Sequence, residues 1–295
     1  MSQEVLALGF GLVTASILAL SAVGFTVQFG VTNVFNLAFG HVMTAAAFVA
    51  YVVNVNAHLP IGVALAAGAA SGALISVAIN RFLYRPFMRR GATLFVMVIV
   101  TLATGAVLLN LLQIVVGTDF HSYTLVQESS IHIAGMIYTP RQLVIIGLAA
   151  GSMLALHLIL RHTRLGKAMR ATQSNDELAR SCGIATDRVT DAAWLLSGAL
   201  CGLAGVALAL NLTSFDFTFG NTFLLIIVAA AVFGSVGHVY GAMVGALVIG
   251  IASEEAAIAA PTLKEVVAFG ILVLILLARP NGLFARAYTQ RMEAQ

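Results

Sequence analysis

A short polar stretch interrupts apolar sequence near the amino terminus. In the octapeptide VFNLAFGH, residues 34–41, an amide, a glycine and an imidazole lie close together at Asn36, Gly40 and His41, and Asn33 precedes them. Unpartnered polar side chains are costly in hydrocarbon, so we expect these groups to face protein or a water-filled path. A helix that breaks here also exposes backbone carbonyls and helix ends, which are polar ligands. The stretch therefore predicts a broken helix along a substrate path, in which Asn36 supplies hydrogen bonds and Gly40 admits the solute or a close helix.

A second Gly-His pair lies far along the chain. The tripeptide at 237–239 is Gly-His-Val, as is that at 40–42, and each is followed by an apolar span, a proline turn, another span and an Arg-Pro pair. This recurrence indicates a parallel internal repeat, and transporters bind substrate near the interface of such repeats. Chance recurrence in a biased composition is the alternative. The repeat adds Gly237 and His238 to the candidate path residues.

Composition identifies the environment that these residues occupy. Of 295 residues, 60% are hydrophobic and 9% are charged, whereas soluble domains carry roughly 25% charged residues. Apolar runs long enough for a bilayer crossing, about 20 residues each, recur from end to end and leave no room for a soluble domain. The sequence predicts an all-α polytopic transmembrane bundle, with one domain over residues 1–295 and the lipid bilayer as its surroundings.

The apolar runs predict eight or nine spans. The run 221–258 contains a Gly-rich interruption, and it is predicted to form either two short helices or a re-entrant hairpin. The predicted segments are 5–29, 32–55, 60–82, 93–116, 141–160, 190–210, 221–235, 239–258 and 265–279.

Basic residues orient the bundle. Thirteen of the 15 lysines and arginines fall within residues 81–90, 161–188 and 279–291, so these loops are predicted to be cytoplasmic by the positive-inside rule. The opposite loops carry mainly acidic residues, including Asp119 and Glu128. The pI of about 9.1 therefore reflects membrane orientation, and no nucleic-acid partner is expected.

The longest basic loop, residues 161–189, contains helix start and stop signals. Ser174 followed three residues later by Glu177 is a capping pattern, and Gly183 is a typical stop. The pattern predicts a short cytoplasmic helix from about Asn175 to Cys182. A docking element for a partner and a solvated loop that only sets topology are the two interpretations.

Four stretches together resemble one transporter family. TRLGKAMRA followed by SNDELARSCGIATDRV is similar to the cytoplasmic loop of branched-chain amino acid ABC importer permeases, and NLAFGH resembles the family's Asn-Phe-Ala-His-Gly motif. GSVGHVYGAMVGALVIG and the closing ARPNGLF also follow its pattern. The chain departs from the motif in placing His41 after Gly40. The resemblance covers essentially the whole chain.

This resemblance implies a permease subunit in the bacterial inner membrane that imports branched-chain or related amino acids by alternating access. Its implied partners are a second related permease, two ATP-binding subunits and an external substrate-binding protein. The short helix would be the coupling helix gripped by an ATP-binding subunit. The residues assigned to this coupling are Asn175, Asp176, Glu177, Arg180 and Gly183.

Other function classes have less support in the sequence. The chain has no GxxxxGK[ST] motif for ATP, so we expect no ATPase site of its own. Two widely spaced cysteines, Cys182 and Cys201, predict neither a disulfide framework nor a metal site, and no cofactor is expected. A permease for urea or short amides in the same family remains an alternative. An ion-coupled carrier and a membrane-embedded enzyme lack the intramembrane ionisable or catalytic groups that they need.

Overall fold

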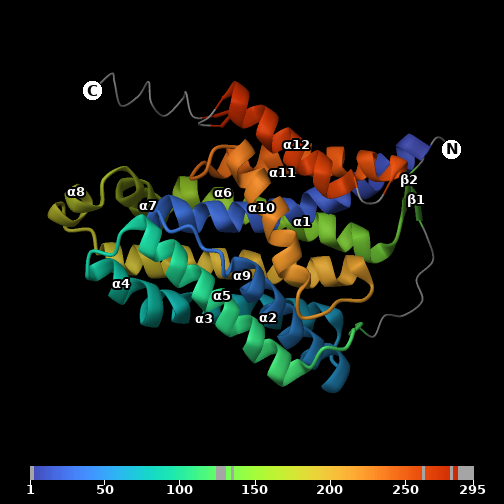
Figure 1. The fold of residues 1–295 in the computed structure, drawn as a ribbon, viewed down its shortest axis with the longest axis horizontal. Coiled ribbons are helices and arrows are strands. Elements are labelled where there is room, and N and C mark those ends of the chain that lie inside the picture. The colour runs from blue at the N-terminus through green and yellow to red at the C-terminus, as the bar shows by residue number, and fades with distance from the viewer. Residues whose placement is uncertain (1–2, 124–130, 134–135, 261–262, 280–281, 285–295) are drawn as a thin grey trace. The chain divides into compact units, whose positions relative to one another are not determined.

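The computed structural model describes residues 3–123, 131–133, 136–260, 263–279 and 282–284 (Figure 1). These residues are almost entirely helical, which confirms the all-α prediction. The exception is a small antiparallel hairpin of β1 (Ile131–Ile133) and β2 (Met136–Tyr138), in which Ile131 pairs with Tyr138. The sequence pattern did not predict this hairpin.

Each predicted span corresponds to one helix or to a helix with its extensions. Among the described residues, seven helices are long and apolar enough to cross a membrane, and α10 and α12 are shorter apolar helices. The first five are α1 (Gln3–Thr32), α2 (Phe39–Tyr51) with a π-helical turn at Val52–Asn56, α3 (Ile61–Ile79) continuing through a π-helical turn at Asn80–Tyr84 into α4 (Arg85–Arg89), α5 (Leu94–Val116) and α6 (Pro140–His162). The remainder are α9 (Thr186–Leu212), α10 (Phe219–Phe233), α11 (Val239–Ala259) and α12 (Leu263–Ala278).

Two interruptions predicted from the sequence are present. Helix α1 ends at Thr32, Asn33 has a left-handed φ of 52°, and α2 begins at Phe39. The run 221–258 forms the two helices α10 and α11, separated by a turn at residues 234–238. The sequence therefore predicted both breaks in the correct places.

The chain folds as two compact units. Unit 1 comprises residues 1–26, 126–150 and 225–295, and unit 2 comprises residues 27–125 and 151–224. The boundaries fall within α1, α6 and α10. The single domain expected over residues 1–295 stays a prediction.

In unit 2, α2, α3 and α9 pack against one another. The packing of α3 on α9 is close because both helices present small residues. A β-carbon added at Gly72 would lie 3.0 Å from Cα of Gly202, and one added at Gly202 would lie 3.1 Å from Cα of Ala69. Small residues of this kind let the backbones of membrane helices approach. Helices α3 and α9 are thereby fixed side by side.

In unit 1, α11 packs on α12 and on the first half of α1. Gly250 of α11 faces Ala15 of α1, with no room for a β-carbon between them. The hydroxyl of Thr14 donates to Glu254 at 2.5 Å, and Lys264 forms an ion pair with the same carboxylate. Part of the ARPNGLF stretch, residues 280–281, lies outside the described residues.

Candidate functional site

Asn36 lies at the centre of the break between α1 and α2. Its side chain is 1% exposed. Its Oδ1 accepts hydrogen bonds from the backbone N–H of Ala38 at 3.1 Å and from the Tyr84 hydroxyl at 3.0 Å, and its Nδ2 donates to Oε1 of Gln28 at 3.4 Å. Buried polar groups are costly unless they are paired in this way. In this conformation the amide fixes the shape of the break.

The same network reaches α9. Oε1 of Gln28 also accepts from the Ser197 hydroxyl at 3.3 Å, and the Tyr84 ring packs edge-on against Trp194 with centroids 5.3 Å apart. Gln28, Tyr84, Trp194 and Ser197 are each at most 1% exposed. The break is therefore joined by buried polar and aromatic contacts to the last turn of α1, the extension of α3, and α9.

Gly40 lies where the first turn of α2 crosses the start of α10. A β-carbon added here would lie 2.5 Å from the carbonyl oxygen of Gly220 and 2.9 Å from Cα of Asn221. The Thr44 hydroxyl secures the crossing, since it accepts from the N–H of Gly220 at 3.2 Å and donates to the Gly40 carbonyl at 3.1 Å. Of the two occupants expected for the space at Gly40, a close helix fills it in this conformation.

His41 and Asn33 complete the first group of path candidates. The His41 ring is 6% exposed and packs on α5, where a β-carbon added at Gly105 would lie 2.8 Å from its Cδ2. Its Nδ1 has no hydrogen-bond partner among the described residues. Asn33 is exposed, and its N–H donates to the Phe29 carbonyl at 2.7 Å. Unit 2 thus brings Asn33, Asn36, Gly40 and His41 into one segment.

Gly237 and His238 lie in unit 1, in the turn before α11. Gly237 has a φ of 93°, and the N–H of His238 donates to the Ser235 carbonyl at 3.0 Å. The left-handed φ at Gly237 is a conformation that glycine adopts without steric cost. These two residues shape the link between α10 and α11, and their share in a substrate path stays a prediction.

The basic loop contains two helices where the sequence predicted one. Helix α7 (Arg164–Ser174) begins after Thr163, whose hydroxyl accepts from the N–H of Gly166 at 3.1 Å. Met169 and Thr172 are buried on one face, and α7 packs on α9. The spacing of Leu165, Met169 and Thr172 was the available sequence signal for this amphipathic helix.

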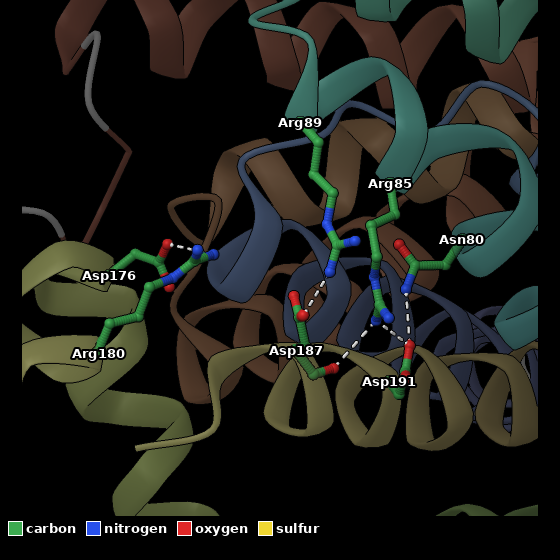
Figure 2. Close-up of polar contacts among 7 residues, drawn as sticks. All are labelled: Asn80, Arg85, Arg89, Asp176, Arg180, Asp187 and Asp191. Atoms are coloured by element: carbon green, nitrogen blue, oxygen red, sulfur yellow. Dashed lines mark hydrogen bonds and ion pairs between the residues drawn. The ribbon is translucent and has the colours of Figure 1, made fainter. Parts of the chain in front are cut away.

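The short helix predicted in the basic loop is present as α8 (Asp176–Ser181), but its predicted cap is wrong; its coupling role stays a prediction. Ser174 is the last residue of α7, and the cap is Asn175, whose Oδ1 accepts from the N–H of Leu178 at 2.9 Å. Both are good capping residues, and the extended backbone of Asn175 decides between them. Asp176 and Arg180 form an exposed ion pair at 3.0 Å (Figure 2).

The end of α8 follows the prediction. Gly183 has a φ of 84°, as the stop signal requires, and its N–H donates to the Arg180 carbonyl at 2.9 Å. Glu177 and Leu178 are exposed, the latter at 61%. Helix α8 therefore presents a largely uncovered surface in unit 2. Helices α4, α7 and α8 all lie at one end of this unit (Figure 1). This is expected if the two basic loops of unit 2, residues 81–90 and 161–188, are on one side of the membrane.

Unit 2 also contains an aromatic cluster that sequence reasoning missed. His121 pairs with Phe215 through a β-bridge, and its ring lies edge-on to Phe48 and Tyr51. The hydroxyl of Tyr123 donates to the Ala47 carbonyl at 2.8 Å. Burial raises the pKa of Tyr123, because desolvation disfavours the phenolate. This phenol is neutral at physiological pH and serves as a hydrogen-bond donor.

Comparison with known proteins matches this architecture to one family. The family model described as "Branched-chain amino acid transport system / permease component" matches residues 7–276. The high-affinity branched-chain amino acid transport system permease protein LivH of Escherichia coli strain K12 is 29% identical, with 96% of each chain covered. The corresponding protein BraD of Pseudomonas aeruginosa is 28% identical, again with 96% of each chain covered.

Two further similarities are more distant in function or sequence. The ribose import permease protein RbsC of Escherichia coli strain K12 is 29% identical over 248 residues, which cover 80% of this chain and 73% of that protein. Among solved structures, PsaBC from Streptococcus pneumoniae in complex with Fab has a TM-score of 0.50 at 14% identity, covering 90% of this chain and 89% of that one. The latter is a likeness of fold alone. The apolar helices and the family model that matches residues 7–276 show that the chain belongs to the branched-chain amino acid transport system permease family.

Proposed function

We propose that this chain is the permease subunit of an ATP-driven importer that carries branched-chain or related amino acids inward across a bacterial inner membrane. The observation that carries the proposal is the family match over residues 7–276. Relatives named for branched-chain amino acid transport align with nearly the whole chain. Transport proceeds by alternating access, in which helices on either side of a central path rearrange around the solute.

The energy for transport enters through partner subunits. The chain lacks the lysine-containing phosphate loop, so ATP binds to two associated ATP-binding subunits. A second related permease and an external substrate-binding protein complete the importer. One ATP-binding subunit grips α8 through its exposed face, to which Asp176, Glu177 and Arg180 contribute, while Asn175 and Gly183 fix the ends of the helix.

The substrate path includes the segment at the break between α1 and α2. The four candidates in unit 2 act differently: Asn36 holds the break, Gly40 permits the crossing of α2 and α10, and His41 and Asn33 supply polar groups. Gly237 and His238 contribute from the turn before α11. The buried Nδ1 of His41 has no partner among the described residues, so His41 is the candidate most in need of a hydrogen bond from a passing solute.

A second substrate class has an observation in its favour. The similarity to a ribose import permease extends over 80% of this chain, so the permease scaffold accommodates chemically different solutes. Urea or short amides are an alternative within the family, and an ion-coupled carrier is the less favoured class. Competition against labelled leucine by valine, urea, acetamide and ribose separates these substrates.

The experiment that tests the assembly is affinity purification of the tagged chain from its own host membranes. We expect a second permease and an ATP-binding protein to co-purify. Leu178→Asp places a charge on the exposed face of α8, and should release the ATP-binding protein while retaining the second permease. A matched control is Leu59→Asp, at an exposed position in the loop before α3, which should leave the ATP-binding protein bound. Absence of any ATP-binding protein from the wild-type purification would contradict the proposal.

A further inference from the structure

Two arginines of α4 face two aspartates of α9 (Figure 2). Arg85 pairs with Asp191, and Arg89 pairs with Asp187 at 2.6 Å. Residues four apart on a helix share one face. Because Arg85 and Arg89 have this spacing on α4, and Asp187 and Asp191 have it on α9, the two helices meet through two consecutive ion pairs.

The two pairs differ in their surroundings. The side chains of Arg85 and Asp191 are 13% and 27% exposed, whereas those of Arg89 and Asp187 are 65% and 49% exposed. Further bonds support the inner pair. Nδ2 of Asn80 donates to Oδ1 of Asp191 at 3.1 Å, and Nη2 of Arg85 also donates to the Asp187 carbonyl at 3.0 Å. We name Asn80, Arg85 and Asp191 the clasp.

On one side, Asp191 of the clasp follows the coupling helix closely in the sequence. Helix α8 ends at Ser181, and α9, which carries Asp191, begins at Thr186. The intervening turn is short and hydrogen-bonded, since the N–H of Ile184 donates to the Ala179 carbonyl at 3.0 Å and the N–H of Thr186 donates to the Ile184 carbonyl at 2.9 Å. The turn therefore links α8 closely to the first turn of α9.

On the other side, the clasp is next to the helix break. Arg85 directly follows Tyr84, whose hydroxyl is bonded to Asn36. Tyr84 also packs on Trp194, which lies one turn beyond Asp191 on α9. A series of contacts thus runs from the start of α9 through the partly buried clasp and the buried Tyr84 to the break.

We propose that Arg85 and Asp191, supported by Asn80, are positioning residues that transmit movement of the coupling helix to the break at Asn36. This inference rests on the proposed function, because it names the internal route by which an ATP-driven movement at α8 reaches the substrate path. The clasp makes the start of α4 follow the start of α9. Without it, the ATP-binding subunit can still bind α8, but its movement no longer repositions the break.

The test uses the full importer in nanodiscs or proteoliposomes, with three readouts: co-purification of the ATP-binding subunit, ATP hydrolysis, and solute uptake per ATP hydrolysed. Arg85→Gln should keep assembly and hydrolysis while uptake per ATP falls about tenfold, within the usual 5–150-fold range of coupling between sites. Arg85→Lys should recover only part of the loss, because lysine keeps the positive charge but lacks the rigid planar guanidinium from which Nη2 donates to both the Asp191 carboxylate and the Asp187 carbonyl.

The exposed outer pair is the matched control. Arg89→Gln removes the same charge one turn away and should change uptake per ATP by less than about twofold, because exposed ion pairs contribute little. The exchange Arg85→Asp with Asp191→Arg restores opposite charges and should recover uptake per ATP relative to either single change. Such recovery would show that the pairing of the two charges matters, and not a general loss of structure. The comparison remains informative even where the single variants fail to assemble.

Two results would overturn the inference. In the first, Arg85→Gln lowers uptake, ATP hydrolysis and assembly by the same factor, and the exchanged pair recovers none of them. The clasp would then be a stabilising contact only. The other is unchanged uptake per ATP in Arg85→Gln. Failure of the proposed function looks different, since the wild-type assembly itself would then show no ATP-dependent uptake.

Discussion

The Tyr84 hydroxyl donates a hydrogen bond to Oδ1 of Asn36 at 3.0 Å, joining the extension of α3 to the break between α1 and α2. Both residues are at most 1% exposed, so no water competes for the bond. Tyr84 is also adjacent to Arg85, which pairs with α9. This bond therefore connects the ion pairs between α4 and α9 with the candidate substrate path.

Tyr84→Phe removes only this hydroxyl. We expect a loss of about 1 kcal/mol in stability, the usual net value of one buried hydrogen bond, seen as a lower midpoint of thermal unfolding in detergent. Tyr51→Phe is the control, because the Tyr51 hydroxyl forms no hydrogen bond with a described residue and its removal should leave the midpoint unchanged. Equal midpoints for the two variants would show that the bond contributes nothing.

Asn36→Leu tests whether the amide holds the break. The change leaves the Tyr84 hydroxyl and the Ala38 N–H without their acceptor, at about 1–3 kcal/mol for each unsatisfied buried group, so the yield of assembled permease should fall. Asn110→Leu is the control, since Asn110 is exposed on α5 and, among the described residues, bonds only within its own helix, to the Ala106 carbonyl. If Asn36→Leu assembles normally but takes up no solute, the amide would instead act by binding the solute.

Gly40→Ala tests the crossing of α2 and α10. The added β-carbon would lie 2.5 Å from the Gly220 carbonyl oxygen, so α10 must move and the folded permease should be destabilised by about 1–3 kcal/mol. Gly147→Ala on α6 meets no atom within 4 Å and should stabilise its helix by about 0.5–1 kcal/mol. The thermal midpoints of the two variants should shift in opposite directions, and a shared increase would show that the crossing has room.

Gly183→Val tests the docking role of α8. Valine in the left-handed region costs roughly 1–2 kcal/mol, so the turn after α8 should distort while the membrane helices still insert. We expect less ATP-binding subunit per permease after purification. Gly62→Val changes a glycine that has open space around it and no left-handed φ, and should retain the subunit. Wild-type association and uptake in Gly183→Val would reject docking at α8.

Cysteine labelling tests the predicted orientation. Ser174 and Ser122 are both exposed; Ser174 ends α7 in a predicted cytoplasmic loop, and Ser122 lies in the predicted outer loop after α5. In a Cys182→Ala background, an impermeant thiol reagent added outside should label Ser122→Cys and leave Ser174→Cys unlabelled, because the positive-inside rule predicts that the basic loops are cytoplasmic. Ser129, in the same predicted outer loop, lies outside the described residues and makes a second outer site. Labelling of both Ser122→Cys and Ser174→Cys from one side would reverse the span assignment.

The sequence predicted the helices well because long apolar runs have few structural alternatives in a membrane. It also located the break at VFNLAFGH, since polar residues and glycine are costly inside a lipid-facing helix. It missed α7 because the basic residues Arg164, Lys167 and Arg170 resemble a solvated loop, and only burial against α9 makes the segment a stable helix. The observed cap of α8, Asn175, lies one residue after the predicted cap, Ser174, because both residue types are suitable caps.

The partners of the polar side chains in the site could not be predicted from the sequence, for a different reason. Asn36 was expected to need partners, but nothing local shows that one of them is Tyr84, 48 positions away. The same holds for the ion pairs between α4 and α9. The sequence shows two arginines four residues apart and two aspartates four residues apart, but it does not show that the arginines face the aspartates. These pairs depend on the close packing of α3 on α9, which is set by glycines distributed along both helices.

The central claim is that this chain carries amino acids inward when a partner hydrolyses ATP. The most direct measurement is uptake of labelled leucine by proteoliposomes that contain the purified assembly, with the substrate-binding protein on the outside and ATP trapped on the side of α8. We predict accumulation with ATP, none with ADP, and none when the ATP-binding subunits carry an inactivating change in their phosphate loop. ATP-independent leucine equilibration that persists in the inactive assembly would contradict the account.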